Sequence, residues 1–128
     1  MNQCTAIKKE DLTRPNFHWL DFFRSNTAEK LGIQNYPDPV DEFIILDNLM
    51  STADLLQECR DILGCAIFIN SGYRCLLLNN ALPGASKTSD HMKGLASDIR
   101  SPSFGSPEDI MKKLHSAGVE VDQCFCEG

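Results

Sequence analysis

Five residues in one short segment have the types and the spacing that suit a metal centre. His91 supplies an imidazole and Asp98 a carboxylate, and both groups bind first-row metal ions in proteins. Gly94 allows the chain to turn between them, so that a histidine on a loop and an aspartate on the next strand can converge on one ion. Ser89 and the small Ala96 would shape the surroundings of these ligands. The segment therefore predicts a metal site held by His91 and Asp98.

An ordinary surface pair of His91 and Asp98 is the alternative. Histidine and aspartate alone at this spacing would carry no weight, but the full pattern Ser-x-His-x-x-Gly-x-Ala-x-Asp fixes five positions. At ordinary residue frequencies, a sequence matches all five positions by chance about once in 10⁶ starting points. The pattern resembles that of the zinc D-Ala-D-Ala peptidases, a family that includes phage endolysins and is similar in fold to the Hedgehog signalling domain.

The resemblance to the small phage and prophage branch of this family extends over residues 16–127. It rests on four further segments in the expected order: Asn16-Phe17 through Arg24-Ser25-Asn26-Thr27-Ala28, Gly32-Ile33-Gln34-Asn35, Ser71-Gly72-Tyr73-Arg74 with Leu78-Asn79, and Asp122-Gln123-Cys124-Phe125-Cys126-Glu127. The third segment follows a predicted strand, and sites are often built at the end of such a rigid element. Ser71, Tyr73 and Ser89 are expected beside the metal ligands.

The resemblance implies a zinc peptidase that cleaves peptidoglycan stem peptides. By position, His91 and Asp98 would be two of three zinc ligands, and Glu127 would be the general base that takes a proton from the zinc-bound water. Arg74 would hold a substrate carboxylate or the developing oxyanion with its fork of donors. The alternatives are that Arg74 pairs with an acidic neighbour and that Glu127 lies in solvent.

The sequence departs from the family pattern at the third zinc ligand. That ligand is a histidine a few residues beyond the glutamate, whereas this sequence ends one residue after Glu127. A catalytic zinc site normally has three protein ligands, so we expect weak zinc binding, a shortened or degenerate gene product, or a substitute ligand. His18, His115, Cys124 and Cys126 are candidate substitutes, but each is better explained as a packed or solvated side chain.

The composition bounds the class of protein. The chain has 128 residues, 42% of them hydrophobic, which suits one globular domain. Its net charge of −6 argues against nonspecific binding of nucleic acid. No stretch approaches the roughly 18 consecutive apolar residues of a membrane span. We therefore expect neither a nucleic-acid partner nor insertion into a membrane.

The N-terminus lacks the basic and apolar regions of a signal peptide. We expect synthesis in the cytoplasm, and action at the cell wall only after a phage-type release. Without a signal peptide, reduced thiols are expected for the six cysteines, which are Cys4, Cys59, Cys65, Cys75, Cys124 and Cys126.

The apolar patterns predict an α+β domain over residues 16–128, preceded by an N-terminal arm over residues 1–15. The expected architecture is a small, mainly antiparallel sheet with helices on one side and the metal site at its open face. Residues 1–13 are expected to be loosely held. Helices are predicted at 26–30, 39–63 and 107–117, with a helical turn at 74–80, and strands at 66–69, 95–100 and 119–127.

Two sets of apolar residues are expected to pack in the core. An aromatic cluster is too dense to leave in water; it comprises Phe17, Trp19, Leu20, Phe22 and Phe23. The long helix is expected to begin at Pro39, capped by Asp38. Its predicted core face consists of Val40, Phe43, Ile44, Leu49, Ala53, Leu56 and Leu63.

Two functions from different classes follow. The first is a zinc-dependent peptidase of the D-Ala-D-Ala carboxypeptidase or endopeptidase type. The second is a non-catalytic wall-binding or phage structural domain that keeps the fold with an incomplete metal site. The zinc content of the protein would discriminate between them.

Overall fold

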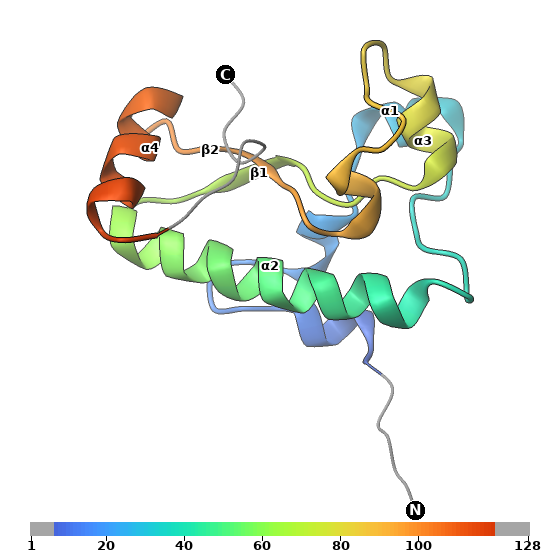
Figure 1. Cartoon of the computed structure of the whole chain (residues 1–128), viewed down its shortest axis with the longest axis horizontal. Helices are drawn as coiled ribbons and strands as arrows, with labels where there is room; N and C mark the ends of the chain where they lie inside the picture. Colours follow the sequence, from blue (N-terminus) through green and yellow to red (C-terminus); the bar gives the residue numbers. More distant parts are fainter. Residues whose placement is uncertain (1–6, 120–128) are drawn as a thin grey trace, which may run out of the picture.

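The computed structural model describes residues 7–119, which combine short helices with a two-stranded antiparallel sheet (Figure 1). The α+β class expected from the sequence is thus confirmed at this level. The elements are the 3-10 helices η1 (Lys9–Leu12), η2 (Trp19–Phe22) and η3 (Asp90–Lys93), the helices α1 (Asn26–Leu31), α2 (Glu42–Leu63), α3 (Leu76–Ala81) and α4 (Pro107–Ser116), and the strands β1 (Phe68–Ser71) and β2 (Asp98–Arg100).

The sheet carries an irregularity at the end that faces the predicted site. Phe68 pairs with Arg100, but the register shifts after Ile69, so that Ser71 comes to lie opposite Asp98. A bulge of this kind bends a strand and redirects its side chains. Strand β1 begins two residues later than the predicted range 66–69, and β2 occupies only the last three residues of the predicted range 95–100. The predicted strand 119–127 lies almost wholly outside the described residues.

Helix α2 runs beneath the sheet, whereas α4 lies beyond one end of the sheet and α1 and α3 lie beyond the other (Figure 1). The prediction that helices pack on one side of the sheet therefore holds for α2. The core lies between α2 and the sheet, and α2 contributes its buried face: Ile45, Leu46, Leu49, Thr52, Ala53, Leu56, Cys59 and Leu63.

The predicted start of the long helix is wrong. The helix begins at Glu42 with Asp41 as its N-cap, and residues 39–41 form a turn. Val40, Phe43 and Ile44 are exposed, Val40 to 89%. The helical period explains the error, because residues three and four positions before Leu49 share its face, whereas Phe43 and Ile44 lie six and five positions before it.

The N-terminal residues from 7 to 13 are not loosely held. Leu12 is completely buried, and η1 packs against α2. The Arg14 side chain then joins the two segments, because its Nε donates to Asp54 Oδ1 at 2.7 Å and its Nη1 donates to the Asp11 carbonyl oxygen. The aromatic cluster packs as expected, except that Leu20 is 44% exposed.

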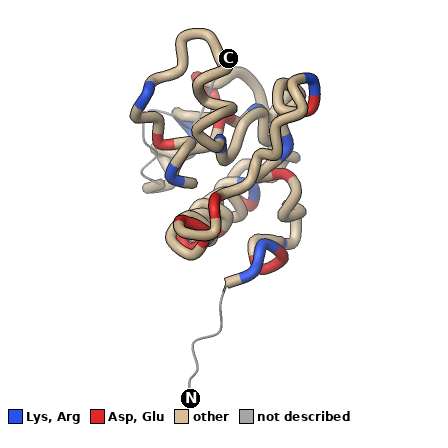
Figure 2. Tube along the Cα trace, turned by 90° about the vertical axis from the view of Figure 1, so that its right-hand side faces the viewer, with Lys and Arg blue, Asp and Glu red and all other residues tan. Residues whose placement is uncertain are grey.

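Two helices begin at serines whose side chains cap them. The Ser25 hydroxyl accepts a hydrogen bond from the Ala28 backbone N–H, and Ser106 forms a capping box with Asp109. Within residues 7–119, Cys65 and Cys75 form no disulfide bond. None of the described helices is long and apolar enough to cross a membrane. Basic and acidic residues are interspersed along the described chain (Figure 2).

Candidate metal centre

His91 is held in one orientation by the fold. It lies in η3, where the Ser89 hydroxyl accepts a hydrogen bond from its backbone N–H. Its ring is buried, and Nδ1 lies 2.7 Å from the carbonyl oxygen of Gly72. Because a carbonyl oxygen can only accept, Nδ1 carries a hydrogen and Nε2 is the nitrogen presented to the site. Metal-binding histidines are commonly oriented through their other nitrogen in this way.

Asp98 begins β2 and faces the imidazole of His91. Its Oδ2 lies 3.3 Å from His91 Nε2 and 3.4 Å from Arg74 Nη2. The carboxylate is buried although its strand has only three residues. The structure therefore brings together both predicted ligands, from two segments joined by the turn at Gly94.

Gly94 makes the expected turn and also allows a close approach to α2. Its φ of +77° lies in the left-handed region, and a Cβ added there would lie 2.9 Å from the Leu49 side chain. Thr52 Oγ1 donates to the Gly94 carbonyl oxygen at 2.8 Å, and Asn48 Nδ2 donates to the Lys93 carbonyl oxygen at 2.8 Å. Helix α2 thus anchors the loop that carries His91.

Arg74 is the third member of the cluster, and each of its guanidinium nitrogens has a partner. Its Nε donates to Ser71 Oγ at 3.1 Å, its Nη1 to Asn79 Oδ1 at 3.4 Å and its Nη2 to Asp98. Arg74 does pair with an acidic neighbour, the alternative left open above. Since that neighbour is Asp98, the pairing holds the guanidinium at the site.

Tyr73 supports the predicted site through its backbone. Its N–H donates to the Phe22 carbonyl oxygen, and its carbonyl oxygen accepts from Asn35 Nδ2, both at 2.8 Å. Its ring packs against Phe23 with the centroids 6.0 Å apart. The main chain of Tyr73 therefore lies beside the predicted ligands, whereas its ring lies in the core.

Burial of the Tyr73 phenol predicts a loss of stability at high pH. Burial raises its pKa to about 12, and the negative charges of Cys75, Asp38 and Asp41 act in the same direction. The folded state favours the neutral phenol, so this contribution is present below the unfolded pKa of about 10 and is lost as the pH rises from 10 to 12. The urea midpoint should fall over that window and fall less steeply in Tyr73→Phe. Equal slopes in the two proteins would contradict the assignment.

Two asparagines that support this region were not predicted as site residues. Asn35 Nδ2 donates to the carbonyl oxygens of Phe23 and Tyr73, and its Oδ1 accepts from the Cys75 N–H. Asn79 is only 2% exposed. The signal available in the sequence for Asn79 was its place in the motif Leu78-Asn79, which carries part of the family resemblance. Asn35 thus holds the backbone on both sides of Arg74, at Tyr73 and at Cys75.

Asn79 also ties Arg74 to the wall of a cavity. Its Oδ1 accepts from Arg74 and its Nδ2 donates to the Ser86 carbonyl oxygen at 2.7 Å. The cavity has a volume of about 500 Å³. It is lined by Arg74, His91 and Asp98 and by the loop residues Leu82, Pro83, Gly84, Ala85 and Ser86. The His–Asp pair therefore faces a space that can admit a small ligand.

Replacing Asn79 with alanine should lower the free energy of unfolding by about 1–3 kcal/mol, because it removes two part-buried hydrogen bonds, one of them from the charged Arg74 guanidinium group. Chemical denaturation measures this loss. Asn80→Ala is the matched control, because Asn80 is its exposed neighbour on the same helix. Equal losses in the two variants would show that the Asn79 hydrogen bonds contribute nothing.

The described residues include two of the predicted metal-binding side chains, His91 and Asp98. Residues 7–119 contain no group of three or more His, Cys, Asp or Glu side chains that could hold an ion. His18 is engaged as the N-cap of η2, where its Nδ1 accepts from the Leu20 N–H, and His115 is exposed in the last turn of α4. Glu127, Cys124 and Cys126 lie outside the described residues.

The family comparison places the chain among the metallopeptidases, which hydrolyse peptide bonds. The family model described as Peptidase M15 matches residues 15–124, which is most of the chain, so the chain belongs to this family. Peptidases of this family are generally zinc-dependent. No match was found among curated proteins or among solved structures.

Proposed function

We propose that this protein is a zinc-dependent peptidase that acts on peptidoglycan stem peptides, of the D-Ala-D-Ala carboxypeptidase or endopeptidase type. The observation that carries the proposal is the buried pair of His91 Nε2 and Asp98 Oδ2, 3.3 Å apart beside a cavity of about 500 Å³. Membership of the family supports peptide hydrolysis. The resemblance of the sequence to the phage and prophage branch of the family supports a phage or prophage origin. It also supports action at the cell wall after a phage-type release.

The donors of the described residues fit zinc. An imidazole nitrogen and a carboxylate oxygen are usual zinc ligands, and the hydrogen bond from Nδ1 to Gly72 leaves His91 Nε2 available. Bound zinc would polarise the scissile carbonyl and lower the pKa of its water to about 7. A catalytic zinc site usually has three protein ligands, of which His91 and Asp98 would be two.

Arg74 is proposed to bind the substrate. Ser71 and Asn79 fix its guanidinium group at the cavity wall, so the group needs little reorganisation to bind a carboxylate or a developing oxyanion. Glu127 is proposed as the general base that takes a proton from the attacking water. Its assignment is supported by the resemblance of residues 122–127 to the last catalytic strand of the family.

A non-catalytic domain is the second candidate, and one observation favours it. The Asp98 carboxylate already has two positively charged or potentially charged partners, Arg74 and His91. Its charge is thus compensated without a metal ion. A domain that had lost its zinc could keep this arrangement and bind the cell wall without cleaving it.

Digestion of purified muropeptides by the zinc-treated protein tests the proposal. Mass spectrometry of the products should show loss of a terminal alanine for a carboxypeptidase, or a cleaved cross-link for an endopeptidase. A zinc chelator should stop the reaction. Intact muropeptides, together with binding of the protein to insoluble cell wall, would favour the non-catalytic domain instead.

A further inference from the structure

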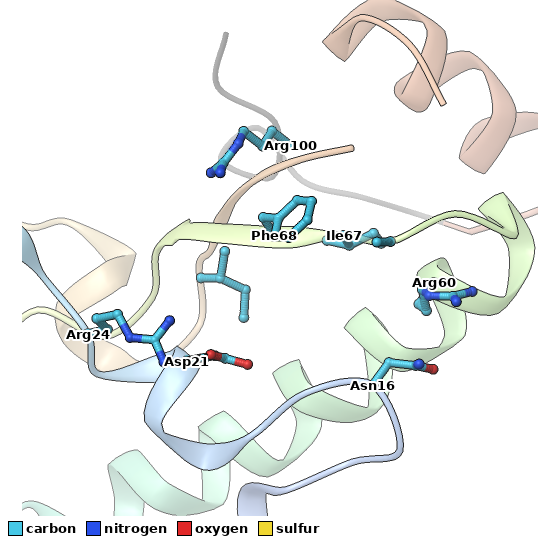
Figure 3. A pocket seen from close by; sticks show the side chains of 9 residues that line it. Asn16, Asp21, Arg24, Arg60, Ile67, Phe68 and Arg100 are labelled. Carbon is cyan, nitrogen blue, oxygen red and sulfur yellow. Dashed lines mark ion pairs between the residues drawn. The ribbon is translucent and has the colours of Figure 1, made fainter. Parts of the chain in front are cut away.

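A second cavity, with a volume of about 430 Å³, lies along β1 and shares no lining residue with the cavity at His91 (Figure 3). The four consecutive residues 66–69 line it, and the remaining wall comes from the segment 16–24, Arg60 of α2 and Arg100 of β2. Successive side chains of a strand point to opposite faces of a sheet. Phe68 and Ile69 are the first two residues of β1, and residues 66 and 67 lead into it. A cavity that contacts both successive strand residues therefore lies at the edge where β1 begins.

The edge of β1 at this cavity offers backbone groups to a ligand. Within residues 7–119, β1 pairs only with β2. In an antiparallel pair, neighbouring residues alternate between directing their N–H and C=O groups toward the partner strand and away from it. Either Phe68 or Ile69 therefore presents both groups to the outer edge. Such an edge can pair with an added extended peptide.

The charge of this cavity is opposite to that of the whole chain. Three arginines and one aspartate line it, which leaves two net positive charges in a protein of net charge −6. Asp21 neutralises Arg24 at 3.2 Å. Arg100 contacts the Phe68 ring and donates to the neutral Asn70 amide, and Arg60 has no ion pair within the described part of the chain. Two guanidinium groups are thus available to anionic groups of a ligand.

The positions of the arginines favour an elongated ligand. Figure 3 shows Arg24 and Asp21 toward one end of the cavity and Arg60 toward the other, with Arg100 above β1. Carboxylates spaced along an extended chain could contact arginines on different sides of the cavity while the backbone of the chain follows β1.

From these observations we propose that the cavity beside β1 binds an extended acidic peptide segment. The peptide backbone pairs with the outer edge of β1, and its carboxylates contact Arg60 and Arg100. This site uses no residue of the His91–Asp98 pair, so it can be tested whether or not the protein cleaves peptidoglycan.

Fluorescence anisotropy with a labelled peptide of three Glu-Val repeats tests the proposal. The full chain should bind it saturably. Binding should weaken about fivefold to tenfold when the peptide glutamates become glutamines or when the protein carries Arg60→Gln with Arg100→Gln, because two charge-assisted contacts are lost. Lys112→Gln with Lys113→Gln makes the same change of charge on exposed positions of α4 and should leave the affinity unchanged.

Two competitors and one modified peptide test the remaining parts of the proposal. N-methylation of alternate peptide amides should abolish binding, since it removes the donors that would pair with β1. Equal binding of the N-methylated peptide, or of the glutamine peptide, would overturn the proposal. Displacement by inorganic phosphate beyond the effect of sodium chloride at equal ionic strength would instead indicate a site for a small anion. Stronger binding of an oligonucleotide of the same charge would also contradict it.

Discussion

Asp98→Asn should lower muropeptide cleavage by more than about 100-fold. Losing a hydrogen-bond partner of a metal ligand costs up to about 100-fold, and we expect the loss of the ligand's own charge to cost more. The substitution removes the charge of a proposed zinc ligand while keeping its size. Asparagine can still accept a hydrogen bond from Arg74, so the variant should remain folded. Asp98→Ala should abolish cleavage too, but it also leaves the largely buried guanidinium group of Arg74 without its ion-pair partner and should destabilise the protein.

Asp90→Asn is the matched control for this experiment. Asp90 lies in the same loop region, but its carboxylate is partly exposed and pairs only loosely with Lys93, at 3.8 Å. We expect its cleavage rate to stay within about twofold of the unmodified protein, as is usual for loss of a surface ion pair. If Asp98→Asn and Asp90→Asn cleave at the same rate, Asp98 is not a metal ligand in the reaction.

Gly72→Ala should lower the free energy of unfolding by about 2 kcal/mol or more. A Cβ at this position would lie 2.6 Å from the carbonyl oxygen of Phe22 and 3.0 Å from its Cα. The obstacle is backbone in the core, so it cannot move aside cheaply. The Gly72 carbonyl oxygen also orients His91, and the displaced backbone should weaken zinc binding by about 10-fold.

Gly32→Ala separates the steric effect from the general cost of replacing a glycine. Gly32 has a φ of +70°, so alanine is strained there by about 1–2 kcal/mol, but a Cβ meets nothing within 4 Å. Only Gly72→Ala should change zinc affinity. Chemical denaturation and a zinc titration of both variants test this prediction, and unchanged zinc affinity in Gly72→Ala would contradict the link between Gly72 and His91.

Local patterns indicate two helix starts and the convergence of the two candidate ligands. The serine side chains at Ser25 and Ser106 cap helices by bonding to backbone groups three positions away, so these caps can be predicted from short stretches of sequence. The convergence of His91 and Asp98 was predictable for a similar reason, because a short turn at Gly94 connects them. Their assignment to zinc came from the resemblance to a family.

The supports of the site could not be predicted in this way, because they join distant segments. Asn35 bonds to Tyr73, 38 positions away, and Thr52 bonds to Gly94, 42 positions away. A single sequence contains no record of which asparagine or threonine meets which backbone group. The arginines beside β1 come from α2, β2 and the segment between η2 and α1, and only the folded chain places them around one cavity.

The exposed start of α2 shows a different limit. Phe43 and Ile44 are apolar, but the face that meets the sheet is set by Leu46 and Leu49. Apolar residue types alone do not tell which of two neighbouring faces will be covered. The boundary was predicted from a different signal, because Asp38 and Pro39 are typical of a helix start, whereas residues 39–41 form a turn.

A zinc titration of the unmodified protein and of His91→Ala tests the central claim most directly, with His115→Ala as the control because His115 is exposed in α4. Isothermal calorimetry in competition with a chelator measures the affinities. We predict one zinc ion for each unmodified chain, an affinity more than about 100-fold weaker in His91→Ala, and no change in His115→Ala. Equal affinities in the unmodified protein and His91→Ala would contradict a metal centre at His91 and Asp98.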